Sequence, residues 1–183
     1  SDDFECGLNC YATGGSGALD EMGENASDGN DGLGGAIFNA SFGVATLGGC
    51  SLNSNKAVGG AGDGLNIGSS GGGGRGGAIY NDSGSVTVTD SSLTSNVAHG
   101  GIGGNGDSEA GRGGGASGGA IFNFDGSVTL TNDAVSNNTS AGGSGGSTDP
   151  QVNGIAFGFG GGASGGGVFS DGTLTVTGGS FSG

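Results

Sequence analysis

The sequence predicts an all-β fold, a parallel β-helix (a solenoid) of about four coils with long glycine-rich side loops. One phrase recurs four times: GGAIFN at 34–39, GGAIYN at 76–81, GGAIFN at 118–123 and a degenerate GGVFS at 166–170. Its aromatic residue falls at Phe38, Tyr80, Phe122 and Phe169, so the period is 42, 42 and 47 residues. A fixed period of this size indicates an array of stacked units. Alternating runs rich in valine and threonine follow each phrase, which favours strands.

Residues 1–33 are expected to form an acidic N-terminal cap and glycine-rich segment. Eight of the chain's 17 acidic residues lie in 2–31. Cys6 and Cys10 belong to this segment, and Cys50 is the third cysteine. With an odd count, Cys6–Cys10, Cys10–Cys50 and Cys6–Cys50 are all allowable pairs. A disulfide-stapled cap outside the cell is the preferred interpretation.

Residues 34–183 are expected to hold the β-helix repeats, which start near 34, 76, 118 and 165. Each repeat contains alternating runs whose apolar residues are expected to face the core, and we call these residues anchors. The first and the last anchor of a repeat are seven residues apart. The anchors are Ala45 to Leu52, Val86 to Leu93, Val128 to Val135 and Leu174 to Phe181. Together with the GGAIF segment, each repeat therefore offers three short strands, the content of one coil.

The rest of each period is a glycine tract, at 59–76, 100–118 and 142–165. These tracts are either second coils almost without side chains or loops that leave one edge of the helix, and loops are favoured. If the loops are ordered, we expect extended, polyproline-II-like packing, in which missing side chains let backbones approach.

The GGA[ILV] phrase and a second motif, [FLV]xxN at 52–55, 93–96 and 135–138, resemble the repeats of polymorphic outer membrane proteins and related bacterial surface β-helix proteins. The resemblance covers 34–183 and implies a right-handed, pectate-lyase-like β-helix. It also implies a secreted or surface-exposed passenger domain in adhesion and cell-surface architecture. The glycine tracts are longer than that family's usual spacing. The motif's Asn55, Asn96 and Asn138 fit an internal, structural asparagine ladder.

The charge excludes several function classes. Seventeen acidic residues against three basic ones give a net charge of −14. Nucleic acid is not an expected partner, because nothing neutralises a row of phosphates. No membrane span is expected, since no apolar run approaches about 18 residues. A start at Ser-Asp-Asp without Met suits a processed, exported chain, so we expect a secreted, extracellular or cell-surface location.

Catalysis is not expected, because His99 is the only histidine and the three basic residues are scattered. Cofactors are not expected either, apart from possible calcium. Acidic residues on glycine-rich turns suit calcium, and the 29–33 segment resembles half of a calcium-binding nonapeptide. The calcium candidates are Asp28, Asp31, Asp63 and Asp107.

Hydroxyl groups and asparagines supply the other candidate sites. Outward threonines at Thr87, Thr89, Thr129, Thr131, Thr175 and Thr177 resemble the ice-binding face of β-solenoid antifreeze proteins, provided that the units stack directly at coil spacing. Sequons place possible N-glycosylation at Asn25, Asn39, Asn81, Asn137 and Asn138. The aromatic row is either a sugar-stacking strip or, preferably, a second small core.

The predicted function is structural: a subunit of an extracellular filament, sheath or adhesive surface layer. The sequence reaches Phe181 without a capping element, and exposed strand edges promote pairing with another chain. Either the chain is a fragment of a longer protein, or the next subunit of a filament covers its open end, and both alternatives indicate an elongated assembly. We therefore expect self-assembly by end-to-end β-stacking, with possible glycan or cell-surface contacts. The alternative is a binding module for calcium, glycan or ice on a β-helix passenger domain.

Overall fold

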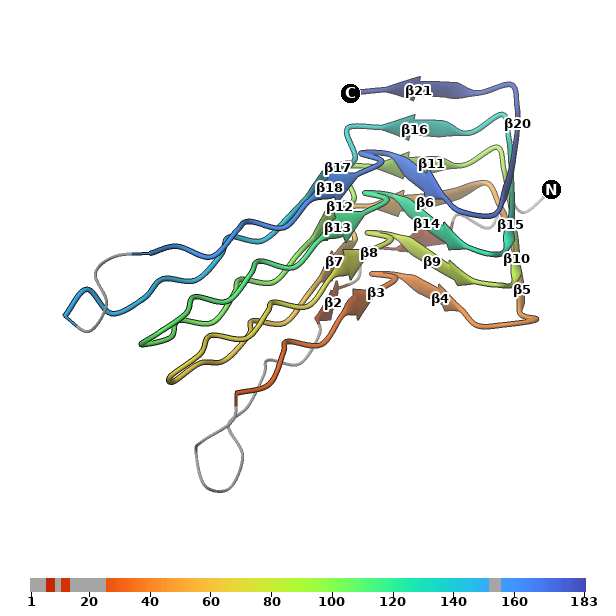
Figure 1. The fold of residues 1–183 in the computed structure, drawn as a ribbon. Coiled ribbons are helices and arrows are strands. Elements are labelled where there is room, and N and C mark those ends of the chain that lie inside the picture. The colour runs from red at the N-terminus through yellow and green to blue at the C-terminus, as the bar shows by residue number, and fades with distance from the viewer. Residues whose placement is uncertain (1–5, 9–10, 14–25, 152–155) are drawn as a thin grey trace.

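The computed structural model describes residues 6–8, 11–13, 26–151 and 156–183, and it is a right-handed parallel β-helix of about four coils. The strands form five sheets, and every pairing between strands is parallel. Figure 1 shows the coils stacked along one axis, with a set of long arms that leave the stack on one side. The predicted fold class is therefore confirmed, side loops included.

Three sheets form the body of the solenoid, and we name each by its outward residues. The aromatic sheet contains β4 (Ile37–Asn39), β9 (Ile79–Asp82), β14 (Ile121–Phe124) and β19 (Val168–Ser170). The threonine sheet contains β5 (Val44–Gly48), β10 (Ser85–Thr89), β15 (Ser127–Thr131) and β20 (Thr173–Thr177). The serine sheet contains β1 (Cys6–Leu8), β6 (Cys50–Asn53), β11 (Ser92–Thr94), β16 (Ala134–Ser136) and β21 (Ser180–Ser182).

Two narrower sheets join the solenoid to the arms. One contains β2 (Tyr11–Thr13), β7 (Lys56–Val58), β12 (Val97–His99) and β17 (Thr139–Ala141). The other contains β3 (Gly32–Leu33), β8 (Gly74–Arg75), β13 (Ala116–Ser117) and β18 (Ala163–Ser164). Each coil thus has five strands where the sequence predicted three. The two additional strands have only two or three residues, too few to show an alternating pattern.

The core is a narrow column of aliphatic side chains between the three body sheets. The predicted anchors are inside it: Val86 is 1% exposed, and Val88 and Leu93 are 0% exposed. Ile79 and Ile121 complete it from the aromatic sheet. Because successive side chains of a strand point to opposite faces, this arrangement sends the threonines and the aromatic rings outward.

Each repeat begins with a glycine that the backbone requires. Gly34, Gly76, Gly118 and Gly165 have φ between 59° and 64°. A Cβ atom at Gly76 would lie 2.1 Å from the carbonyl oxygen of Ile79. This left-handed turn lets the chain enter the aromatic sheet from the arm, so the recurring GG of the phrase has a steric cause.

The glycine tracts are ordered arms, and their hydrogen bonds follow a three-residue period. In the arm at 100–115, the N–H of Gly100 donates to the next coil at Ala141, and the N–H of Gly101 donates to Gly72 of the preceding arm. The same two directions recur three residues later, at Gly103 and Gly104. Three residues per turn and bonds only to neighbouring strands are the properties of polyproline-II helices. The tracts are loops rather than second coils, and they pack as that geometry requires.

Close approach of backbones explains the glycine content of the arms. A Cβ atom would lie 1.9 Å from a carbonyl oxygen at Gly101 and at Gly114, and 2.0 Å from one at Gly146. Larger residues, such as Ile102, occupy the third position of the period, where the side chain points out of the array. Glycine is therefore a packing residue in these arms.

Candidate functional site

The threonine sheet presents two in-register columns of threonine. Thr46, Thr87, Thr129 and Thr175 are aligned in one column, and the second holds Gly48, Thr89, Thr131 and Thr177. The coils stack directly on one another, as a regular array of threonines requires. Neighbouring strands are therefore about 4.8 Å apart, and alternate residues along one strand about 6.7 Å apart.

This outward face is uncharged and its hydroxyls are open to solvent. Its twelve positions hold eight threonines, two serines, Val44 and Gly48. Ser127 donates to the hydroxyl of Ser85 at 3.2 Å. No threonine hydroxyl of the two columns has a protein hydrogen-bond partner in the part of the chain that the structure describes. These hydroxyls can therefore order water.

The predicted asparagine ladder is present inside the solenoid. Asn55 and Asn96 are 0% exposed. Asn96 Oδ1 accepts the backbone N–H and the side-chain amide of Asn55, each at 2.9 Å, and Asn138 Oδ1 does the same for Asn96. The Nδ2 of Asn96 also donates to the carbonyl of Leu52 at 2.8 Å. These side chains hold the turn between the serine sheet and the arm.

A second asparagine ladder lies at the other corner, and sequence reasoning missed it. Asn39 Nδ2 donates to Asn81 Oδ1 at 2.7 Å, and Asn81 Nδ2 donates to Asn123 Oδ1 at 2.7 Å. Asn123 Nδ2 then donates to Ser170 Oγ at 2.9 Å. The signal was the invariant Asn that closes each GGAI[FY]N phrase, at the same register in three repeats.

The second ladder bears on the glycosylation candidates. Asn81 is 0% exposed and Asn39 is 7% exposed, and in both the Nδ2 that a glycan would occupy donates within the ladder. Asn137 is exposed, with φ 53°, and Asn138 is half-buried in the first ladder. Asn25 lies outside the described residues. Among these four described positions, Asn137 is the accessible one.

The aromatic row stacks on itself outside the core. The centroids of Phe38, Tyr80, Phe122 and Phe169 are 5.2, 5.2 and 5.1 Å apart along the row, with interplanar angles of 4°, 11° and 6°. Tyr80 is 9% exposed and Phe122 7%, whereas Phe38 at the row's end is 51% exposed. A sugar would need a free ring face to stack on. The interior rings have none, so the row is a second small core.

A charged pair from the arms borders this row. The Arg75 guanidinium carbon lies 5.9 Å from the ring centroid of Phe122, and Arg75 forms an ion pair with Asp31. Burial, followed by the charge of Asp82, raises the pKa of Tyr80. A groove of about 430 Å³ runs here, lined by Arg75, Tyr80, Ser117, Phe122, Phe124, Phe169 and Asp171.

Three of the calcium candidates lie along the arms and accept backbone hydrogen bonds. Asp28 Oδ1 accepts the N–H of Ser70 at 2.7 Å, and Asp31 Oδ1 accepts that of Gly73 at 2.6 Å. These carboxylates bond to outward N–H groups of the next coil's arm. Asp63 accepts the N–H of Gly64 at 2.8 Å. Nowhere in the described residues do three or more His, Cys, Asp or Glu side chains gather as a metal site would require.

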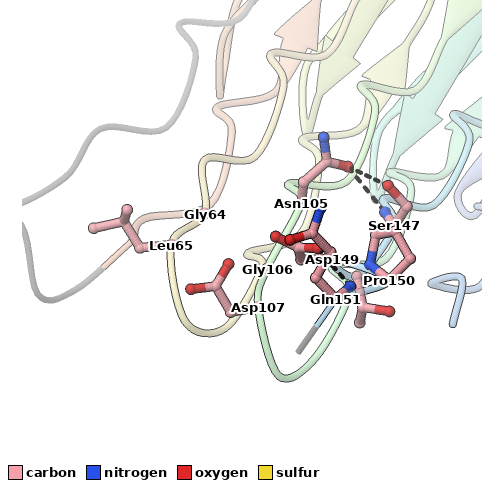
Figure 2. A pocket seen from close by; sticks show the side chains of 10 residues that line it. Gly64, Leu65, Asn105, Gly106, Asp107, Ser147, Asp149, Pro150 and Gln151 are labelled. Atoms are coloured by element: carbon pink, nitrogen blue, oxygen red, sulfur yellow. Dashed lines mark hydrogen bonds between the residues drawn. The ribbon is translucent and has the colours of Figure 1, made fainter. Parts of the chain in front are cut away.

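Asp107 lines a hollow at the tips of the arms, which Figure 2 shows. This hollow has a volume of about 540 Å³ and lies among the tips of three successive arms. Asn105 Oδ1 accepts the N–H of Ser147 at 2.9 Å and its hydroxyl at 3.2 Å. Asp149 accepts the N–H of Gln151 at 2.8 Å. The first two bonds join the tips of two neighbouring arms, and the third is a local turn within one arm.

A third ladder of side chains contains the buried cysteine. Cys50 N–H donates to Ser91 Oγ at 2.9 Å, and Ser91 N–H donates to Asp133 Oδ1 at 2.8 Å in the next coil. Asp133 is 2% exposed, and burial raises the pKa of its carboxyl despite the backbone N–H groups of Ser91 and Thr131. In register, Cys6 lies directly opposite Cys50. Cys10 lies outside the described residues.

The last coil exposes the side chains that other coils bury. Leu174 is 39% exposed, Val176 44% and Phe181 51%. The matching residues two coils earlier, Val86, Val88 and Leu93, are at most 1% exposed. Outer edges of β18, β19, β20 and β21 pair with no strand among the described residues. This coil is the outermost one among the described residues, and its core side chains are exposed for that reason.

In comparisons with protein-family models, curated proteins and solved structures, nothing matches this chain. No helix in the described part of the chain is both long and apolar enough to cross a membrane.

Proposed function

We propose that this protein is an extracellular structural module that stacks end to end with copies of itself. The observation that carries the proposal is the direct stacking of the coils: strands of successive coils pair in parallel and in register, and their inward side chains form one continuous column. The edge of such a coil is a template for pairing with the strands of a further coil, including one from another copy. The resemblance to bacterial surface β-helix proteins supports the extracellular setting.

The first coil offers matching strands to the last coil. Stacked in register, β18, β19 and β20 of one copy meet β3, β4 and β5 of the next. Val168 then faces Ile37, and Val176 faces Leu47, as their counterparts do between successive coils. Phe169 continues the aromatic row onto Phe38, the ring that is 51% exposed. Ser170, the last member of the second asparagine ladder, then faces Asn39, its first member.

Net charge opposes this contact and makes it dependent on salt. Each copy carries −14, so copies repel one another at low ionic strength. At 0.15 M salt the Debye length falls to about 8 Å, which screens most of this repulsion. We expect association to rise with salt and with protein concentration.

Light scattering and electron microscopy of the purified chain test the proposal. Val176→Asp places a charge in the open core and should abolish association. Thr175→Asp is the matched control, because it adds the same charge one residue away on the outward face. Rods that lengthen with concentration, and carry a repeat of about 4.8 Å, are expected. A wild-type chain that stays monomeric at high salt, or equal loss in both variants, would refute end-to-end stacking.

The threonine sheet supports a second function, ice binding. Its two columns are flat, uncharged and in register, with hydroxyls that bond no protein group in the described structure. The spacings of about 4.8 and 6.7 Å arrange the hydroxyls in a regular two-dimensional array that could order water in a repeating pattern. Thr129 and Thr131 lie near the centre of this array.

Thermal hysteresis measures this second function directly. Thr129→Tyr should remove most of the activity by breaking the flat array. Thr94→Tyr, on the outward face of the serine sheet, is the control and should leave the activity unchanged. Absence of hysteresis and of ice shaping in the wild type, at millimolar protein, would refute ice binding without affecting the stacking proposal.

A further inference from the structure

Two of the chain's three cysteines occupy the same position in neighbouring coils. β1 pairs with β6 in parallel, and the register sets Cys6 directly opposite Cys50. The same column continues with Ser91 and Asp133 in the next two coils. The sequence left every pairing of the three cysteines open, and this register distinguishes one of them from the others.

The described side chains of this column are directed at the preceding coil. Ser91 Oγ accepts the N–H of Cys50 at 2.9 Å, and Asp133 Oδ1 accepts the N–H of Ser91 at 2.8 Å. Cys50 has the same orientation as Ser91, because each bonds through its side chain to the carbonyl oxygen two residues before it, at 3.6 and 2.8 Å. The sulfur of Cys50 is therefore directed at β1, where the next residue of the column is Cys6.

The spacing of the two strands fits a covalent bond between these residues. Strands of neighbouring coils are about 4.8 Å apart, and a disulfide needs α-carbons about 4.4–6.8 Å apart. We propose that Cys6 and Cys50 form a disulfide that fastens β1 to β6. This inference rests on the extracellular setting of the proposed function, in which disulfides persist, and it does not depend on end-to-end stacking.

Formation of the bond is a two-electron oxidation, for which a small disulfide such as oxidised glutathione is the oxidant. The thiolate of one cysteine attacks a sulfur of the oxidant, which forms a mixed disulfide and releases one thiol. The thiolate of the other cysteine then attacks the protein sulfur of the mixed disulfide and releases the second thiol. The protons of the two cysteine thiols pass to the two released thiols. Because Cys50 is 7% exposed, this exchange precedes the docking of β1 on β6 or accompanies its opening.

The bond constrains a long segment of the chain. It closes a loop of about 45 residues that contains β2, β3, β4 and β5, which are the other strands of the first coils and their arm. A cross-link across a long loop stabilises the folded chain mainly by restricting the unfolded one. The oxidised chain should therefore stay folded at temperatures at which the reduced chain unfolds.

Peptide mapping without reduction identifies the bonded pair. The full chain is refolded with a mixture of oxidised and reduced glutathione, alkylated and cleaved after glutamate, which separates the segment of Cys6 and Cys10 from that of Cys50. The wild type and a Cys10→Ser variant should both give one linked pair of peptides. A Cys6→Ser variant should give none. A link through Cys10, or no link at all, would overturn the proposal.

Thermal unfolding tests whether the bond stabilises the fold. Cys50→Ser is the matched variant, because it copies Ser91 of the next coil and keeps a polar atom in the column. Without reductant, its Tm should lie about 5–15 °C below that of the wild type. With dithiothreitol the two Tm values should coincide, since neither chain then holds the bond. Equal Tm values without reductant, or a difference that persists under reduction, would contradict the stabilising role.

Light scattering on the same samples keeps this inference separate from stacking. Wild-type rods that lack the link between Cys6 and Cys50 would refute the disulfide and leave stacking intact. Linked chains that stay monomeric at high salt would refute stacking and leave the disulfide intact.

Discussion

Replacing Gly114 by alanine should unfold the arms, whereas the same change at the adjacent Gly115 should not. A Cβ atom at Gly114 would lie 1.9 Å from the carbonyl oxygen of Gly72 and 2.6 Å from its carbon. At Gly115 the nearest atom, the carbonyl oxygen of Gly162, is 3.5 Å away, which is ordinary contact. Neither glycine has positive φ, so the two variants differ in space rather than in backbone preference.

The cost at Gly114 follows from the bonds that its displacement breaks. Its N–H donates to Gly101 at 2.8 Å, and its carbonyl accepts the N–H of Gly143 at 2.9 Å. Two hydrogen bonds at about 0.5–1.5 kcal/mol each, with partners left unpaired in a buried array, give a loss of about 2–4 kcal/mol. For a chain of this size, that loss lowers Tm by about 5–15 °C. Gly115→Ala should instead stabilise by about 0.4–1 kcal/mol, since alanine restricts the unfolded chain.

Thermal and urea unfolding, followed by circular dichroism, compare the two variants under identical conditions. Two-state analysis requires coincident transitions in the two assays. Equal stability of the Gly114→Ala and Gly115→Ala variants would show that the arms do not pack closely in solution. The assignment of Gly114 to a closely packed position and of Gly115 to an open position of the three-residue period would then be wrong.

Three further predictions concern the ladders of the solenoid. Asn96→Ala should cost about 2–4 kcal/mol in urea unfolding, because it leaves the buried N–H of Asn55 without its acceptor, whereas Asn53→Ala on the exposed side should cost less than about 1 kcal/mol. Burial raises the folded pKa of Asp133 above its unfolded value, so its contribution to stability is greatest below about pH 4 and is lost as pH rises through the folded pKa. Asp133→Ser copies Ser91 of the preceding coil. Between pH 3 and pH 7, the Tm of this variant should therefore rise relative to the Tm of the wild type, and a constant difference would contradict this. Tyr80→Leu breaks the aromatic row and should lower Tm by several degrees, whereas Tyr80→Phe should not, as differential scanning calorimetry can check.

The sequence predicted the body of the solenoid because its signals are local and repeated. Alternation over five residues identified Val86 and Val88 as inward and Thr87 as outward, and the structure agrees. Asn55 and its equivalents were correctly placed inside, because an amide at a fixed position in each repeat suits a ladder. Asn81 also recurs at a fixed position of the repeat, but it belongs to a sequon, so the sequence predicted a glycan acceptor there. Only the burial of its side chain shows that it is a ladder residue.

The arms and the site assignments depended on information that the sequence did not contain. Glycine has no side chain whose period can be read, so the three-residue phase of 100–115 becomes visible only through hydrogen bonds between coils. The acceptor role of Asp28 and Asp31 follows from that phase, since the N–H of the third residue in each turn faces outward. Where two partners lie 42 residues apart, as Asp28 and Ser70 do, local patterns do not reveal the pairing.

A common spacing explains how two such different structures share one chain. In the solenoid, strands of successive coils are about 4.8 Å apart because they share ladder hydrogen bonds. In the arms, each strand also donates to the equivalent strand of the next coil, as Gly100 does to Ala141 and Gly71 to Arg112. These bonds of 2.8–2.9 Å keep the arms at the same rise as the coils. Because the rise is common to both, a copy added in the proposed stack would extend the threonine columns, the aromatic row and the arm array together.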